Sequence, residues 1–148
     1  MTEISPKDLV YIEMAGNGGH LGNVPDRKEG ALLVNQDSRI KGIGYFKTNL
    51  PEDDWYLDEW YLDPIEILLL HTTPTDRVGA TIYTNGPVQR NQAQLLHEAG
   101  VHRVVLQDPQ QDREGVPFMV AREIQVDEVT GDLNSKQGEN EDERQENP

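Results

Sequence analysis

The amino-acid sequence predicts an α/β fold, and two stretches supply the evidence. Residues 79–106 contain a strand, a turn, a helix and a second strand in succession, with each boundary marked. The first strand is rich in β-branched residues and stops at Asn85-Gly86-Pro87, and Gly100 stands where a left-handed helix C-cap belongs. The apolar run 101–106 suits a buried parallel strand, so the stretch is predicted to be a βαβ unit. A hairpin pattern over residues 31–45 is the second observation.

The elements before this unit follow in order along the chain. Ser5-Pro6-Lys7-Asp8 combines an N-cap, a first-turn proline and an acid that can bond back, which predicts a helix start. The glycines of residues 16–22 predict that this helix ends early and continues as a flexible connection, because glycine disfavours helix. Residues 31–34 are predicted to be a buried strand, and residues 40–45 the return strand, with Ile43 facing inward.

The rest of the chain is predicted from caps and composition. Residues 63–71 indicate a helix with Pro64 in its first turn, and residues 72–77 a polar connection. Residues 118–129 contain enough Val, Ile and Phe for a final strand, with a short helix before it. The acidic residues 130–148 contain no aromatic residue and are expected to be a disordered tail, so residues 1–129 form the single predicted domain.

Composition excludes several classes of function. The chain has 148 residues, a net charge of -14 and no cysteine. Disulfides, thiolate catalysis and a cysteine-ligated zinc site are therefore excluded, and direct nucleic-acid binding is not expected because the chain repels phosphates. No apolar run approaches the roughly 20 residues of a membrane span, and the first residues contain no signal-peptide core. A cytoplasmic protein without a membrane partner is expected.

Residues 50–62 form an acidic segment that contains both tryptophans. Trp55, Tyr56, Trp60 and Tyr61 stand among acidic residues, and no basic residue occurs between Lys47 and Arg77. In one interpretation the aromatic rings pack on the core while the acids face water. In the other they anchor an interface that attracts a basic partner. The sequence leaves both interpretations open.

Two stretches resemble the zinc-dependent cytidine and deoxycytidylate deaminase superfamily. PDRKEGALLVNQDSRIKGIGY, residues 25–45, is similar to the first hairpin of the family. The order of GATIY, Pro87, AGV and RVV within residues 79–106 is similar to its second half. The resemblance implies a three-layer α/β/α sandwich with a mixed sheet of about five strands, over roughly residues 5–125. It also implies an oligomer.

The zinc ligands of that family are replaced in this chain. The resemblance assigns the histidine and the two cysteines to the positions of Pro64, Val88 and Asn91. We therefore expect zinc to be lost and no other cofactor to replace it. Glu66 stands where the family has its proton-transferring glutamate, and it is interpreted as a vestigial catalytic residue. A substitute metal site would have to use the four histidines, which are His20, His71, His97 and His102.

A binding pocket is predicted around the same positions. Phe46 replaces the asparagine that contacts the nucleoside in deoxycytidylate-type deaminases, and its ring could stack on a base or fill the pocket. The turn before the central helix could present backbone N–H groups to a phosphate. The predicted ligand-binding residues are Phe46, Glu66, Asn85, Gly86 and Asn91.

Three hypotheses of function follow. The first is a catalytically inactive deaminase-like protein that acts by binding an active deaminase subunit, a second copy of itself, or a nucleotide. The second is an acidic interaction or inhibitor protein that engages a basic partner through the loop from Trp55 to Asp63 and the tail. The third is a deoxycytidylate-type deaminase with a relocated metal site.

Overall fold

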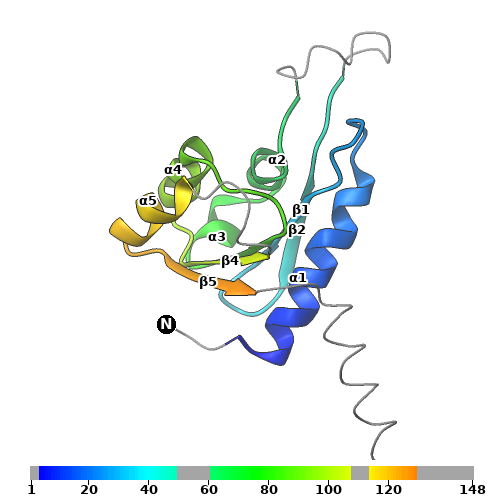
Figure 1. Ribbon diagram of the computed structural model, residues 1–148. Helices are drawn as coiled ribbons and strands as arrows, with labels where there is room; N and C mark the ends of the chain where they lie inside the picture. The colour runs from blue at the N-terminus through cyan, green and yellow to red at the C-terminus, as the bar shows by residue number, and fades with distance from the viewer. Residues whose placement is uncertain (1–3, 50–60, 108–113, 130–148) are drawn as a thin grey trace, which may run out of the picture.

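A mixed sheet of five strands, in the order β2-β1-β3-β4-β5, forms the centre of the molecule (Figure 1). The computed structural model describes residues 4–49, 61–107 and 114–129. β1 pairs antiparallel with β2 and β3, whereas β3, β4 and β5 are parallel. The strands are β1 (Gly30–Val34), β2 (Ile40–Tyr45), β3 (Thr81–Thr84), β4 (Arg103–Gln107) and β5 (Gln125–Val129).

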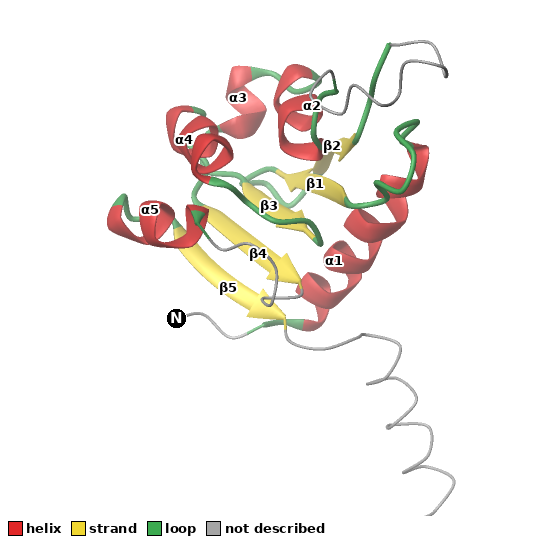
Figure 2. Ribbon diagram, turned by 45° about the horizontal axis from the view of Figure 1, so that its top comes forward, coloured by secondary structure: helices red, strands yellow, loops and turns green. Residues whose placement is uncertain are grey.

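Helices cover both faces of the sheet, which makes three layers (Figure 2). α1 (Pro6–Gly18), followed by the short 3-10 helix η1 (Gly19–Leu21), lies on one face. The opposite face carries α2 (Pro64–Leu70), α4 (Arg90–Glu98) and α5 (Gly115–Ala121), and the single turn α3 (Pro74–Arg77) leads into β3. The predicted three-layer α/β/α sandwich with a five-stranded mixed sheet is confirmed.

Alternation along the strands divides the apolar core between the two faces. In β1, Leu32 and Val34 pack towards α1, whereas Ala31 and Leu33 pack towards α2 and α4. This is the two-residue period of a strand buried on both sides. Ile43 faces inward, as predicted: it is partly buried and packs against the core on the α1 side.

α1 and α2 begin at the capping residues that the sequence predicts. The Ser5 hydroxyl accepts from the N–H of Asp8, and the Asp8 carboxylate accepts from the N–H of Ser5. Asp63 and Glu66 form the same reciprocal capping box at α2. At the end of α4, Gly100 has a φ of 83°, as predicted for the residue that stops this helix.

The predicted early end of the first helix is wrong. α1 continues to Gly18 and η1 to Leu21, so Gly16, Gly18 and Gly19 lie inside helical structure and only Gly22 follows it. They allow close packing: a Cβ on Gly18 would lie 2.5 Å from Ile43 Cγ2, and one on Gly19 would lie 1.9 Å from the Lys28 carbonyl oxygen. Contact with the hairpin stabilises a helix that intrinsic propensity disfavours.

Two other elements differ from the sequence prediction. The polar connection over residues 72–77 contains α3, because the Thr73 hydroxyl accepts from the N–H of Asp76 and Pro74 suits the first turn. Phe118 belongs to α5 and not to the last strand, which begins at Gln125. The apolar residues of 118–129 are thus divided between a helix and a strand, a boundary that composition does not mark.

Parts of the sequence prediction lie outside the described residues. These are Trp55, Tyr56 and Trp60 of the acidic segment and the tail from residue 130. Among the helices that the structure describes, none combines the length and the apolar character needed to cross a membrane.

Candidate functional site

A cavity of about 230 Å³ lies between the starts of α2 and α4. Its walls come from five places in the chain: the segment before β1, the segment after β2, the start of α2, the turn after β3 and the start of α4. The lining residues are Arg27, Glu29, Phe46, Tyr61, Asp63, Pro64, Ile65, Glu66, Thr84, Gly86, Pro87, Gln89, Asn91 and Gln92.

Gly44 allows α2 to lie directly on the sheet beside this cavity. A Cβ on Gly44 would lie 1.9 Å from the Pro64 carbonyl oxygen, so any other residue at this place would force the helix away from β2. The apolar side of α2, with Ile65 and Leu68, is buried against the sheet. The start of the helix, with Asp63 and Glu66, is therefore held at the cavity wall.

A hydrogen bond between two buried side chains joins the two helix starts. The Gln92 Nε2 amide donates to Asp63 Oδ2, and each residue is 7% exposed. Gln92 Oε1 accepts from the N–H of Gln89 at 2.7 Å, and Asp63 Oδ1 accepts from the N–H of Glu66 at 2.8 Å. Each of the two side chains therefore caps its own helix and also links it to the other.

Glu66 forms part of this arrangement and has a perturbed acidity. Its Oε1 accepts from the N–H of Asp63 at 3.2 Å. Burial raises the pKa of the Glu66 carboxyl, the negative charge of Asp63 raises it further, and the hydrogen bond from the Asp63 backbone opposes both effects. Glu66 therefore takes up a proton more readily than an exposed glutamate, and the protonated form can donate a hydrogen bond.

Two aromatic rings and one arginine form another part of the wall. Phe46 is 6% exposed, and its ring centroid lies 5.3 Å from that of Tyr61 in an edge-to-face arrangement. The Arg27 guanidinium lies 5.5 Å from the Phe46 centroid and 5.6 Å from that of Tyr61. Both distances are within the range of cation–π attraction.

The structure brings together four of the five predicted ligand-binding residues. Phe46, Glu66, Gly86 and Asn91 line the cavity. Asn85 lines no part of it, because its Oδ1 accepts from the N–H of Gly30 at 2.8 Å and so joins the turn after β3 to the start of β1. Tyr61, predicted at an interface with the tryptophans, lies in the cavity wall. That these residues bind a ligand stays a prediction.

Other features of the cavity wall are not predicted by the sequence. They are the lining residues Arg27, Glu29 and Gln92, and the role of Asp63 in linking α2 to α4. Asp63 and Gln92 are 29 positions apart, and no local pattern relates them. A signal existed for the capping role of Asp63, because Asp-Pro-x-Glu is a helix-start motif. None existed for Glu29, whose contact with the cavity depends on the fold.

The residues present do not fit the zinc ion that the resemblance implies. Pro64 and Val88 have no donor atom in the side chain, and an asparagine amide is a poor zinc ligand. Val88 is 1% exposed and belongs to the apolar core. Over residues 4–49, 61–107 and 114–129, no three His, Asp or Glu side chains are grouped so as to hold a metal ion.

The four histidines do not meet. They are exposed and belong to separate places in the fold: His20 in η1, His71 after α2, His97 in α4 and His102 before β4. None of them lines the cavity. His97 contacts the Phe118 ring, with the centroids 6.4 Å apart.

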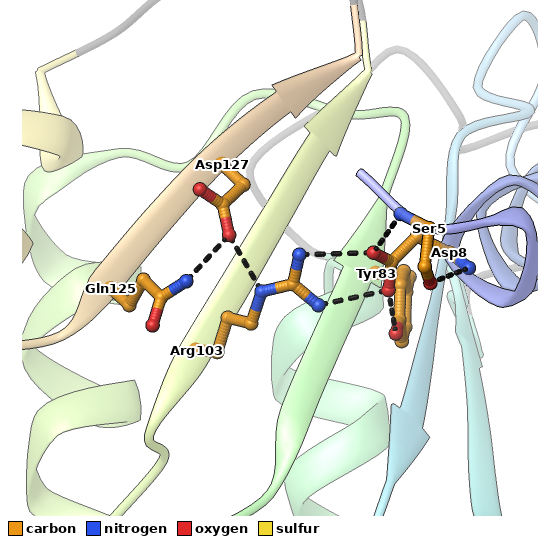
Figure 3. A network of polar contacts seen from close by, with 6 residues as sticks. All are labelled: Ser5, Asp8, Tyr83, Arg103, Gln125 and Asp127. Carbon is orange, nitrogen blue, oxygen red and sulfur yellow. Dashed lines mark hydrogen bonds and ion pairs between the residues drawn. The ribbon is translucent and has the colours of Figure 1, made fainter. Parts of the chain in front are cut away.

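A second polar cluster, which the sequence did not indicate, lies on the α1 side of the sheet (Figure 3). Arg103 contacts two carboxylates: Nη1 lies 2.8 Å from Asp8 Oδ1, and Nε lies 2.7 Å from Asp127 Oδ2. The Tyr83 hydroxyl donates to Asp8 Oδ1 at 2.6 Å. Although burial opposes it, the hydrogen bonds from Arg103, Ser5 and Tyr83 hold the pKa of Asp8 well below its usual range.

Several solved structures resemble this chain in fold. The dCMP deaminase of cyanophage S-TIM5, solved in complex with dCMP and dUMP, has a TM-score of 0.71 and 16% identity, over 86% of this chain and 100% of that one. The apo form of that enzyme gives a TM-score of 0.69. A structure from a study of tRNA:A34 deaminases gives 0.53 with 18% identity, over 84% of this chain and 99% of that one.

A longer protein matches over about a third of its length. The diaminohydroxyphosphoribosylaminopyrimidine deaminase and reductase of Thermotoga maritima matches with a TM-score of 0.51 and 21% identity, over 81% of this chain and 34% of that one. No family model and no curated sequence matches the chain. The likeness to these structures shows the fold, which this chain shares with the deaminases named above.

Proposed function

We propose that this chain binds a nucleotide in the cavity between α2 and α4 and does not deaminate it. The observation that carries the proposal is the Asp63–Gln92 hydrogen bond beside an open, aromatic-walled cavity. The two helix starts are joined by side chains, and the space next to the join can still accept a small molecule.

The cavity offers a distinct partner to each part of a nucleotide. The rings of Phe46 and Tyr61 offer apolar surface to a base, and stacking on such rings suits any base. Among the described residues, the Arg27 guanidinium lies near those rings and forms no ion pair or hydrogen bond, so its N–H donors can pair with a phosphate. In a chain with a net charge of -14, a cation at the cavity gives an anionic group a specific place.

The fold supports the ligand class without establishing it. One protein of this fold, the S-TIM5 dCMP deaminase, is described in complex with dCMP and dUMP. Because one fold supports many functions, the ligand of this chain has to be inferred from its own cavity.

We infer that the chain does not hydrolyse a nucleotide, because its side chains do not supply the ligands for a catalytic zinc ion. Activation of water by zinc needs three protein ligands and one open position. Pro64 and Val88 cannot coordinate, and the Asp63 oxygens are occupied by Gln92 and by the N–H of Glu66. Glu66 is then a hydrogen-bonding residue of the cavity and not a proton shuttle.

Isothermal titration calorimetry with dCMP and with deoxycytidine tests this proposal. We expect saturable binding at one site, with dCMP binding about tenfold more tightly than deoxycytidine because of Arg27. Arg27→Ala should remove this advantage, whereas Arg39→Ala, which changes an exposed arginine just before β2, should preserve it. Lack of binding by the wild type would refute the proposed ligand.

The same sample, with added zinc, is then incubated with dCMP and analysed by chromatography. We expect no dUMP above the level in protein-free buffer. Zinc-dependent conversion that requires Glu66 would refute the non-catalytic part of the proposal and favour a relocated metal site.

Binding to an active deaminase subunit, to a second copy, or to a basic partner stays a prediction. The residues on which those hypotheses depend, Trp55, Trp60 and the tail, lie outside the described part of the chain.

A further inference from the structure

Glu29 is the one acidic residue of the cavity for which the fold supplies no evident use. It immediately precedes β1 and lines the cavity, and its Oε2 is buried without a hydrogen-bond partner among the described residues. A buried carboxylate oxygen without a donor is costly, so such an atom in a stable fold needs an explanation. The carboxylate has the cavity beside it, where a bound molecule could supply the missing donor.

The other carboxylates of the cavity already have partners. Asp63 accepts from Gln92 and from the N–H of Glu66, and Glu66 accepts from the N–H of Asp63. These bonds cap α2 and link it to α4. Glu29 takes no part in them, and among the described lining residues its Oε2 is the buried carboxylate oxygen that is left to accept from a ligand.

The backbone around Glu29 is fixed by its neighbours. The N–H of Gly30 donates to Asn85 Oδ1 at 2.8 Å, and Gly30 is paired with Tyr45 of β2. An added Cβ on Gly86 would lie 3.1 Å from Glu29 Cβ, so the turn after β3 packs closely against this side chain. The terminal torsion of a glutamate is broad, and its rotation lets either oxygen turn to the cavity.

We propose that Glu29 selects the ligand of this cavity, favouring compounds that present N–H donors over compounds that present a carbonyl in the same place. The inference rests on the proposed function. An amino group of the base would donate a hydrogen bond to the carboxylate. A carbonyl oxygen in the same place would not, because both oxygens are acceptors and neither carries a proton to share. Of two nucleotides with the same sugar and phosphate, the one that places an amino group against Glu29 binds more tightly.

The test is a pair of titrations with dCMP and dUMP, which share the sugar and the phosphate. We expect the wild type to bind dCMP at least about tenfold more tightly than dUMP. In Glu29→Gln the amide can donate to a carbonyl or accept from an amine, so the ratio should fall to about threefold or less. Glu98→Gln, an equal change in charge at the far end of α4, should keep the wild-type ratio.

The outcomes separate this inference from the proposed function. If the wild type binds neither compound, the proposed function fails. If it binds both equally, prefers dUMP, or keeps its preference in Glu29→Gln, the proposed function stands and the role of Glu29 is refuted. Should Glu29→Gln fail to fold by circular dichroism, Glu29→Met keeps the length of the side chain without its acceptors and should level the ratio as well.

Discussion

The side-chain amide of Gln92 donates a hydrogen bond to Asp63 Oδ2, and this contact joins the start of α4 to the start of α2. Both residues are buried, and both also accept from backbone N–H groups of their own helices. These two hydrogen-bonded residues form part of the cavity wall. It makes the spacing of the two helices depend on side-chain hydrogen bonds.

The first prediction concerns this bond. Gln92→Ala should lower the free energy of unfolding by about 2 kcal/mol, because it leaves a buried Asp63 oxygen without a donor. A double-mutant cycle with Asp63→Ala, measured by urea denaturation, isolates the pair from the lost caps. We expect a coupling energy of about 1 kcal/mol or more. Strict additivity of the two changes would show that the bond contributes nothing.

The second prediction is a loss of stability in acid that depends on Asp8. The folded state holds the pKa of Asp8 below the value of about 4 for an unfolded chain, so the unfolded state binds the proton more readily. The contribution of Asp8 to stability is therefore complete above about pH 4 and is lost as the pH falls towards the folded pKa.

Urea denaturation over a pH series measures this effect. Asp8→Asn should cost about 3 kcal/mol at neutral pH, because Arg103 loses a buried partner, and it should flatten the acid slope. Asp37→Asn, an exposed acid in the turn after β1, should change neither. An unchanged acid slope in Asp8→Asn would contradict the assignment.

The third prediction concerns Glu66, whose pKa is shifted in the opposite direction. The folded state raises this pKa, so the contribution of the protonated group is present below the unfolded value and is lost as the pH rises through the folded one. If the protonated carboxyl donates to the ligand, affinity for dCMP should decrease as the pH rises above the ordinary glutamate value of about 4.5 and through the raised pKa. Glu66→Gln keeps a donor at every pH and should bind with a flatter profile. Equal profiles for the two proteins would argue against contact between Glu66 and the ligand.

The fourth prediction tests stacking on Phe46. Phe46→Leu keeps an apolar residue in a nearly buried position and removes the aromatic face, so affinity for dCMP should fall about tenfold. Calorimetric titration measures the affinity, and thermal unfolding checks the fold. Leu95→Ala, a change at a half-exposed position of α4 outside the cavity, is the matched apolar control. Unaltered affinity in Phe46→Leu would mean that this ring only fills space.

The fifth prediction concerns the glycines of the first helix. Gly19→Ala should destabilise the fold by about 2 kcal/mol or more, because the new Cβ would overlap the Lys28 carbonyl oxygen at 1.9 Å. Gly16→Ala meets only the Asn85 side chain, at 3.2 Å, and gains helix propensity, so it should be nearly neutral. Similar melting temperatures for the two variants would show that close packing is not what selects glycine at residue 19.

Much of the fold could be predicted because its signals are local. Ser5 with Asp8 and Asp63 with Glu66 lie three positions apart, and each pair forms the cap that its spacing predicts. The βαβ unit was recognised from alternation, helical spacing and Gly100 for the same reason. The error in α1 arose where a local rule met a tertiary contact: glycine disfavours helix in isolation, yet Gly18 and Gly19 allow the hairpin to approach.

The sequence by itself determined that no thiolate is available. It contains no cysteine, and its resemblance to the deaminases predicts that Pro64, Val88, Asn91 and Phe46 stand at metal-binding and nucleoside-binding positions. Composition and order along the chain are sufficient for such statements, because a side chain without a donor atom cannot coordinate in any fold.

Only the tertiary structure decided which residues meet at the cavity. Each of its features depends on residues from different elements. Gln92 contacts Asp63, Arg27 lies near two aromatic rings, Asn85 bonds to the start of β1 instead of lining the cavity, and Glu29 has a buried oxygen. Long-range contacts of this kind leave no period and no motif in the sequence. They form only when the strands assemble into the sheet and the starts of α2 and α4 come to lie beside each other.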